Sequence, residues 1–505
     1  MPDALMSPVP PINRTEVDGV RTLWIDEPGP TIATLVFRVG RSDEPTPLSG
    51  ITHIVEHLSL SALGVQDYDH NGFVDGQQTA FTSMGRSDEV RTFLEAVVHG
   101  LTHPPLDRLL LERRILREER EQRGPSIGGA LRWYRFGYAG QGRALGPGDD
   151  ELALDWLGPE PVEAWVRRWF TRQNAILWLT GPVPAGLRLD LPEGEPAPVP
   201  DITPTPGVLF PAHLAWDGPA ATLGYTATRA SAIHVASNVA HRRARQRLRF
   251  DQGLVYDVEL DYEPIAPTVA HVMLGASCPD ERIRQVVDGL LAIVRELAAD
   301  GPTDQELGQE MSAYVRQYED RDGRIGLLAA TAFDTLWDGP VRTAEQLLEE
   351  RRQVDAPMAA TVLSTALETL LVMANCEPVE ELHAYPSWSP TRVDGREYGP
   401  AGFFLPGRRP KERLFAGPDG ITVAVNPGEW LTVRYADCVA SVHEAPTIRS
   451  LLGRDGMRVG VVAEAWKDGA RVIEEIDRAI PAERVACEEH GIGGLEDPVK
   501  DEPAA

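Results

Sequence analysis

Seven prolines between Leu191 and Pro211 most constrain how this chain can fold. Proline lacks a backbone N–H and fixes φ, so this density rules out a helix or a central strand and favours an extended spacer. A chain of 505 residues is also too long for one ordinary core. The sequence therefore predicts a first domain over residues 1–191, followed by a Pro-rich linker over 192–211.

A second change in composition separates two further units. From Tyr385 to Arg413, Pro, Gly and Arg replace the preceding helical pattern. We expect a second domain over 212–385, a linker over 386–411 and a small β-rich domain over 412–485. The acidic residues 486–505 have the composition of a disordered tail.

The first two regions share a pattern of strands and amphipathic helices. Thr31 to Val39 reads as a strand, and Ser49 is a suitable N-cap for the next helix. Apolar residues at helical spacing predict a helix over 88–103, and a second helix opens near Asp107 and runs through Glu121. In the second region Pro279 starts a helix and Asp304 caps another. The sequence therefore predicts a duplicated α/β unit.

The third region differs in pattern. Short apolar stretches over 421–425 and 430–435 predict strands, and Gly469 to Ile480 predicts a closing helix. The strands followed by one helix resemble a pleckstrin-homology-like barrel. Because the region offers little basic surface, we expect a protein-interaction or dimer-stabilising module.

The segment His53-Ile54-Val55-Glu56-His57 carries the chemistry. At about 100° per residue, positions 53, 56 and 57 lie on one side of a helix. Two imidazoles four residues apart with a carboxylate beside them are the parts of a hydrolytic zinc site. We expect His53 and His57 to bind Zn²⁺. A capped core helix is the alternative for the two histidines.

A third zinc ligand is expected on the helix that opens near Asp107, because a catalytic zinc has three protein ligands and one water. Glu112 and Glu119 are seven apart and lie on one face. We choose Glu119 as the ligand and Glu112 as the carboxylate that orients a ligand imidazole. Glu118 and Glu121 are assigned to a solvated face. Glu56 is then the general base for the attacking water.

These stretches resemble the pitrilysin/insulinase family of inverzincin peptidases, which includes the mitochondrial processing peptidases. The matching residues are 50–58, Asn71-Gly72, 79–83 and Glu112-Arg113 to Glu119. The resemblance implies zinc binding by His53, His57 and Glu119, with Glu56 as the base. Two departures are a short segment between His57 and Gly76, and Thr79 where the family carries Asn, which we expect to weaken contacts to the substrate backbone.

The second region has its own match to that family. Arg249 and Tyr256 resemble the Arg and Tyr pair that members use beside the scissile bond. Physically, a cation and a phenol hydroxyl would hold the substrate carbonyl and stabilise the oxyanion. The alternative places Tyr256 with Val258, Leu260 and Tyr262 on the buried face of one strand.

The resemblance covers roughly residues 15–385 and implies an α+β fold. It consists of two similar domains, each an antiparallel sheet with helices on one face, which together form half of a clam-shell chamber. A homodimer, or a heterodimer with a related half, would close the chamber, and Arg249 and Tyr256 would serve the zinc site of the facing subunit. The expected substrates are short or unstructured peptides.

Composition excludes several classes of function. The net charge of −27 argues against a nucleic-acid partner, since phosphate binding needs clustered Lys and Arg. No run of about 18 apolar residues occurs, so no membrane span is expected. Four widely spaced cysteines suggest free thiols in a reducing cytosol, and we expect a cytoplasmic protein.

The function that these observations favour is a zinc metallopeptidase. The alternative is a non-catalytic scaffold or partner subunit of the same fold. An unrelated α/β hydrolase is discounted because no Gly-x-Ser-x-Gly elbow is present.

Overall fold

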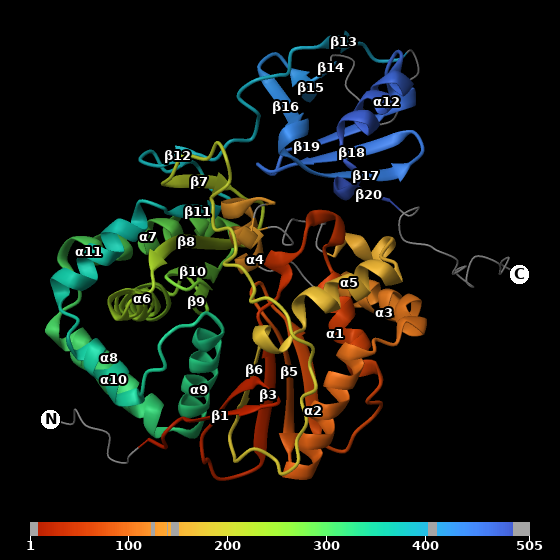
Figure 1. Ribbon diagram of the computed structural model, residues 1–505. Coiled ribbons are helices and arrows are strands. Elements are labelled where there is room, and N and C mark those ends of the chain that lie inside the picture. The colour runs from red at the N-terminus through yellow and green to blue at the C-terminus, as the bar shows by residue number, and fades with distance from the viewer. Residues whose placement is uncertain (1–8, 123–126, 139, 143–150, 402–411, 488–505) are drawn as a thin grey trace, which may run out of the picture.

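The computed structural model describes residues 9–122, 127–138, 140–142, 151–401 and 412–487. Within them the chain forms two six-stranded sheets, each with helices, and two smaller four-stranded sheets (Figure 1). None of the helices in these ranges is both long and apolar enough to cross a membrane. Most of the predicted acidic tail, from residue 488 onward, lies outside the described residues.

The first sheet has the strand order β1-β2-β6-β3-β5-β4. Its strands pair antiparallel except β2 with β6, which run parallel. The strands are β1 Asn13–Val17, β2 Val20–Trp24, β3 Thr31–Phe37, β4 Asp69–Val74, β5 Thr79–Gly85 and β6 Ala175–Leu179. β4 therefore lies at one edge of the sheet.

The helices of the first domain largely follow the predicted pattern. They are α1 Ile51–Ser61, α2 Ser87–Thr102, α3 Leu109–Gln122, α4 Ile127–Phe136 and α5 Pro159–Trp169. The helix predicted near Asp107 opens with one 3-10 turn, Leu106–Arg108, before α3 begins. Apolar side chains of α1, α2 and α5 pack with those of β3 and β6 in one buried cluster, so these helices cover one face of the sheet.

The second sheet repeats this plan, with the order β12-β7-β11-β8-β10-β9. Its strands are β7 Ala212–Ala215, β8 Ala220–Thr228, β9 Glu259–Ala266, β10 Val269–Ser277, β11 Leu371–Ala374 and β12 His383–Ala384. Strands β7, β11, β8, β10 and β9 follow one another as β2, β6, β3, β5 and β4 do in the first sheet. The predicted duplication is confirmed by this shared topology.

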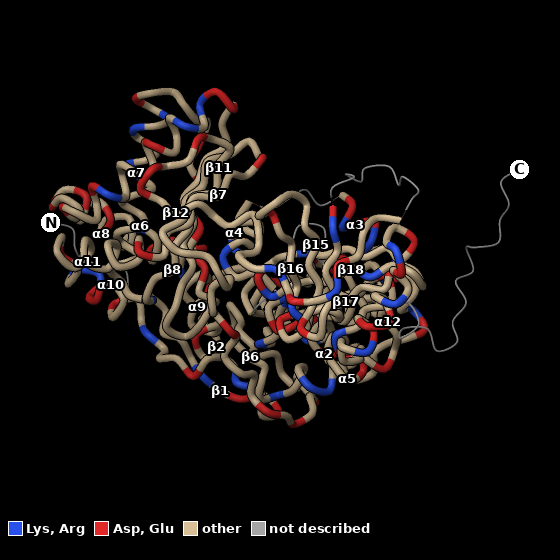
Figure 2. The backbone as a smooth tube through the Cα atoms, turned by 90° about the horizontal axis from the view of Figure 1, so that it is seen from above, with Lys and Arg blue, Asp and Glu red and all other residues tan. Residues whose placement is uncertain are grey.

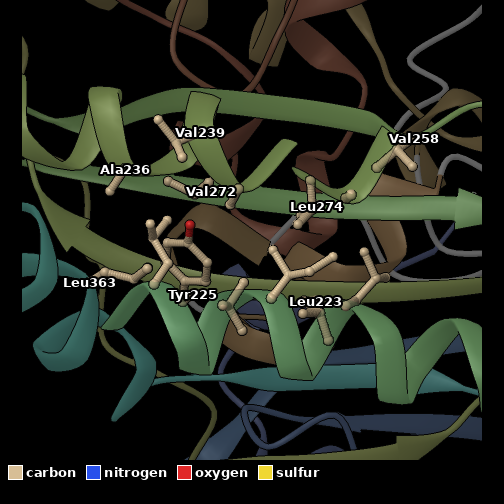
Figure 3. Close-up of a cluster of buried hydrophobic side chains, with 14 of the residues drawn as sticks. Leu223, Tyr225, Ala236, Val239, Val258, Val272, Leu274 and Leu363 are labelled. Atoms are coloured by element: carbon tan, nitrogen blue, oxygen red, sulfur yellow. The ribbon is translucent and has the colours of Figure 1, made fainter. Parts of the chain in front are cut away.

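The second domain has six α-helices among the described residues. They are α6 Ser231–Ala244, α7 Ile283–Asp300, α8 Asp304–Glu319, α9 Arg321–Leu336, α10 Ala344–Arg352 and α11 Ala356–Leu367. Of these, α6, α7 and α11 pack against the second sheet. Figure 3 shows side chains of β8 and β10, including Leu223 and Leu274, meeting Ala236 and Val239 of α6 and Leu363 of α11. The N-cap of α8 is Thr303, whose hydroxyl accepts from the Glu306 N–H, and not Asp304 as predicted.

Each domain also sends one helix onto the other domain's sheet. Leu328 and Leu336 of α9 pack with Ile176 and Trp178 of β6 in the first sheet. In return, Leu131 of α4 packs among residues of β7, β10 and β11. Both sheets are thus covered on two faces, by their own helices and by one helix of the other domain. Sequence periodicity did not predict this exchange.

The third unit combines two four-stranded sheets with one helix. The strands are β13 Arg396–Tyr398, β14 Arg413–Gly417, β15 Gly420–Asn426, β16 Glu429–Arg434, β17 Cys438–Ala445, β18 Ile448–Gly453, β19 Arg458–Val462 and β20 Val485–Ala486. The helix is α12 Gly469–Ala479. β13 pairs with β14, so a strand of this unit falls within the predicted linker 386–411. The pleckstrin-homology-like resemblance stays a prediction.

Charged residues of both signs are spread over all three units (Figure 2). The segment 192–211 contains no helix or strand. It nevertheless contacts the first domain, because the Pro198 carbonyl accepts from Arg38 Nη2 at 3.1 Å and the Ala197 N–H donates to Asn174 Oδ1 at 2.8 Å. The spacer therefore lies against the domain that it leaves.

Arg135 of α4 provides a test of the exchanged helices. Its guanidinium donates to the carbonyls of Thr369 and Gly224 in the second domain, each at 2.6 Å, and burial lowers its pKa to about 9. Arg135→Met keeps an apolar stem but leaves both buried carbonyls without these donors. We expect the variant to lose about 1–3 kcal/mol of unfolding free energy, measured by urea denaturation. Arg114→Met, at an exposed position of α3, is the control, and equal midpoints for the two variants would contradict this role.

Candidate metal centre

The backbone at the start of α1, just before the two histidines, has little conformational freedom. Gly50 has φ +95°, and a Cβ there would lie 2.9 Å from the Glu151 Cα. Ser49, predicted as the N-cap, does not cap the helix. Instead the buried Glu44 carboxylate accepts from the N–H groups of Gly50 and Thr52 at 2.8 and 2.9 Å.

Burial is the main cause that raises the pKa of Glu44 to about 7. The Ser49 hydroxyl accepts from the Leu152 N–H at 2.9 Å. The start of α1 is therefore held by Glu44, which precedes it in the chain, and by the segment at Leu152, which follows it by about a hundred positions.

The structure brings His53, His57 and Glu119 together. One ligand atom from each lies within 4.8 Å of the other two. The His57 Nε2 to Glu119 Oε2 distance is 3.7 Å. His53 is buried, His57 is half-buried and the Glu119 side chain is 46% exposed, so the group opens to solvent on the α3 side.

Two carboxylates hold the far side of the imidazole rings. His53 Nδ1 lies 2.6 Å from Glu151 Oε1, and His57 Nδ1 lies 3.3 Å from Glu112 Oε2. Glu112 is itself held by Arg108, whose Nη2 donates to Oε1 at 2.8 Å. With Nδ1 engaged in this way, each Nε2 is left as the nitrogen that faces the shared group.

Glu151 is the residue that sequence reasoning missed. It is buried, it also lies 3.4 Å from Arg41 Nη2, and it is 98 positions from His53. Nothing in its local sequence resembles a ligand motif. Only the close approach at Gly50, which needs tertiary structure to be seen, could have indicated it.

Glu56 lies between the two histidines. Its Oε2 is 3.7 Å from both His53 Nε2 and His57 Nε2. Burial raises the pKa of Glu56 to about 7, His53 lowers it, and Glu119 and Glu112 add to the rise. A Cβ at Gly72 on β4 would lie 2.0 Å from Glu56 Oε1, so the missing side chain at Gly72 leaves room for this carboxylate.

Thr79 makes an internal contact in the structure, and the expected weakening of contacts to the substrate backbone stays a prediction. Thr79 is fully buried on β5, an internal strand, and its hydroxyl donates to the Val39 carbonyl at 2.8 Å. It is therefore out of reach of a substrate backbone. The residues that approach Glu56 come from the edge strand β4 instead.

Arg249 and Tyr256 lie outside the sheet of the second domain. Arg249 belongs to a π-helical stretch, Arg245–Asp251, and its guanidinium carbon is 5.2 Å from the ring centroids of both Phe250 and Tyr256. Tyr256 is 86% exposed and precedes β9, so the alternative that places it on a buried strand face is wrong. Figure 1 shows α6, which leads into this stretch, and α1 on opposite sides of the two sheets.

The residues of the group fit a zinc ion. Ligand atoms about 2.0–2.2 Å from a tetrahedral zinc lie roughly 3.3–3.6 Å from one another, close to the His57–Glu119 distance. Two imidazole nitrogens and one carboxylate oxygen, with a carboxylate behind each ring, form a donor set of the kind zinc prefers. Glu118 and Glu121 are exposed and take no part in the group.

A pocket of about 410 Å³ lies on the other side of β4. The strand's side chains alternate, so Gly72 faces Glu56 while Phe73 lines the pocket. Val36 and Trp178 of the first sheet and Phe333 of α9 also line it. Arg229, Glu263 and Asp334 line it as well, so the edge strand separates the candidate metal centre from a pocket with both apolar and charged walls.

Solved structures with a similar fold were found. A protease from Helicobacter pylori matches with a TM-score of 0.60 at 15% identity, covering 72% of this chain and 100% of that chain. An inactive peptidase M16 domain from Pseudomonas fluorescens matches at 0.58 and 12%, covering 72% and 97%. The first half of the periplasmic protease PqqL from Escherichia coli matches at 0.57 and 13%, covering 72% and 92%.

The chain therefore has the fold of M16 peptidase-like proteins. At these identities the likeness concerns the fold alone. No protein-family model and no curated protein matches the sequence. Against the whole PqqL protease, with a TM-score of 0.56 at 15% identity, 89% of this chain covers 55% of that protein, so the chain spans about half its length.

Replacing Glu151 tests its contact with His53. In Glu151→Ala the Nδ1 of His53 loses its buried partner, and the ring is no longer held with Nε2 toward the other ligands. We expect zinc affinity to fall about 10- to 100-fold, measured by competition with a chromophoric chelator. Glu118→Ala, an exposed carboxylate on α3, should bind zinc as the unaltered chain does. Equal affinity for the two variants would remove Glu151 from the site.

Proposed function

We propose that this protein is a zinc metalloendopeptidase in which His53, His57 and Glu119 bind Zn²⁺ and Glu56 is the general base. The observation that carries the proposal is the position of Glu56, whose Oε2 is 3.7 Å from each of the two ligand nitrogens. A carboxylate in that place lies beside any water that shares the metal with them.

In the proposed reaction, activation of the water and of the substrate carbonyl comes from the zinc ion, and side chains of the protein transfer the proton. Bound zinc lowers the pKa of a water molecule toward about 7 and polarises a substrate carbonyl. Glu56 takes the proton from the attacking water and returns it to the leaving amine. A pKa raised by burial toward about 7 suits both halves of that exchange.

Glu151 and Glu112 hold the rings through Nδ1 while this proton moves. The buried bond from Glu151 keeps His53 in one tautomer, and Glu112, anchored by Arg108, does the same for His57. The ligand nitrogens therefore need no reorientation during the reaction.

The edge strand β4 supports a peptide as substrate. An unpaired edge offers backbone donors and acceptors to an extended chain. In a folded protein most backbone groups are already paired, whereas those of an unstructured peptide are free to pair with β4. Because β4 runs past Glu56 at Gly72, a peptide paired with it would pass the metal group. The pocket at Phe73 would then receive a substrate side chain. We therefore infer short or unstructured peptides as the substrate class.

We further propose that two half-chambers close around the substrate, as a homodimer or as a heterodimer with a related half. The exposed aromatic rings of Tyr256 and Phe250, stacked with Arg249, support this arrangement because they lie on a part of the surface away from α1. In the closed pair, Arg249 and Tyr256 of one subunit would stabilise the oxyanion at the zinc site of the other.

The first test separates metal binding from catalysis. Glu56→Gln removes the base and keeps a side chain of the same shape. We expect one zinc per chain in both proteins by metal analysis, with peptide turnover at least 100-fold lower in the variant, as loss of a general base costs about 10²–10⁴. Equal turnover by both proteins would remove Glu56 from the mechanism. Zinc in both proteins with turnover by neither would favour the scaffold alternative.

The second test concerns sharing between subunits. An Arg249→Ala chain keeps its base and a Glu56→Gln chain keeps its arginine, so one of the two sites in a mixed dimer has both groups. We expect mixing the two inactive proteins to restore up to about a quarter of the activity, since half of random pairs are mixed and each has one complete site of two. Mixtures no more active than either variant alone would contradict the shared site.

A further inference from the structure

The C-terminal unit joins the core of the first domain. Ala440 and Val442 of β17, Leu452 of β18 and Ala486 of β20 belong to the same buried cluster as the helices that cover the first sheet. Leu451, the residue directly before Leu452 on β18, belongs instead to the unit's own core. Because strand side chains alternate, the sheet β19-β18-β17-β20 has one face toward the unit's own core and the other toward the first domain (Figure 1).

The segment under that face leads directly into α1. β17 and β20 contact the short turn Thr46–Leu48, in which Thr46 and Pro47 are buried. Ser49 and Gly50 follow, and then the helix with His53. Only four residues therefore separate the covered turn from the first proposed zinc ligand.

The same turn is bonded to the segment that follows Glu151. Trp156 Nε1 donates to the Pro47 carbonyl at 3.1 Å. Leu152 and Ala153 donate through their N–H groups to the Ser49 hydroxyl and carbonyl, each at 2.9 Å. The C-terminal sheet thus covers a turn that connects both partners of the His53–Glu151 bond.

We propose that the C-terminal unit is a positioning element of the metal centre, holding the turn 46–48 so that the start of α1 and Glu151 keep His53 in its binding orientation. The unit would act through the backbone of residues 46–50 and 151–153, and not by touching the ligands itself. The part of the inference that concerns zinc rests on the proposed function.

Two adjacent leucines give a matched test. Leu452 and Leu451 are both fully buried neighbours on β18, but Leu452 packs in the first domain's core and Leu451 in the unit's own core. Each →Ala change removes the same atoms and leaves a cavity on a different side of the sheet. We expect Leu452→Ala to weaken zinc binding roughly tenfold, the lower end for loss of support behind a ligand, while Leu451→Ala keeps wild-type affinity. Leu452→Met, which nearly conserves volume, should restore most of the affinity.

A second measurement needs no metal. Hydrogen exchange of the zinc-free protein should become faster in peptides covering 46–57 and 151–157 for Leu452→Ala, and stay unchanged there for Leu451→Ala. If Leu452→Ala does not fold, Leu452→Val makes the smaller cavity and is measured in the same way. Unchanged exchange in Leu452→Ala, or equal acceleration by both leucine variants, would overturn the inference. Absence of zinc binding by the unaltered protein would instead overturn the proposed function, and the exchange result would still decide the positioning role.

Discussion

The buried contact between His53 Nδ1 and Glu151 Oε1, at 2.6 Å, is the interaction on which the candidate centre depends. It joins α1 to a residue nearly a hundred positions later, and it fixes which nitrogen of His53 faces His57 and Glu119. The rest of the neighbourhood is arranged to allow it. Gly50 has no side chain to separate the two segments, and Glu44 bonds the amides that Ser49 leaves unsatisfied.

Periodicity was enough to predict the parts of the centre that repeat with the helix. His53, Glu56 and His57 share a face of α1, and Glu112 and Glu119 are two turns apart on α3, so each set follows from spacing. That the two sets meet was expected from the need for a third zinc ligand and from the family resemblance, and not from spacing. Glu151 could not be found in this way, since its place depends on how distant segments pack. The burial of Thr79 was not predicted for a related reason: the sequence shows a strand but not whether that strand is internal or at an edge.

The fold was predicted at the level of its elements and less well between them. The duplicated sheets follow from the repeated order of strands and helices. The crossing of α4 and α9 onto each other's sheets does not, because an amphipathic pattern shows that a helix has an apolar face and not which surface covers it. The strand β13 was likewise missed because three residues are too few to give a period. Tyr256 is the opposite case, where alternation suggested a strand that begins only at Glu259.

The crossing of α4 and α9 bears on how such a chain could have arisen. A single ancestral unit with one helix extended away from its own sheet would expose two apolar surfaces, and pairing with an identical unit by trading those helices would bury both. Fusion of two such genes would then preserve the traded arrangement within one polypeptide. The linker 192–211 would in that case mark the junction between the two fused genes. Cleaving the backbone within it should leave the first and second domains bound to each other.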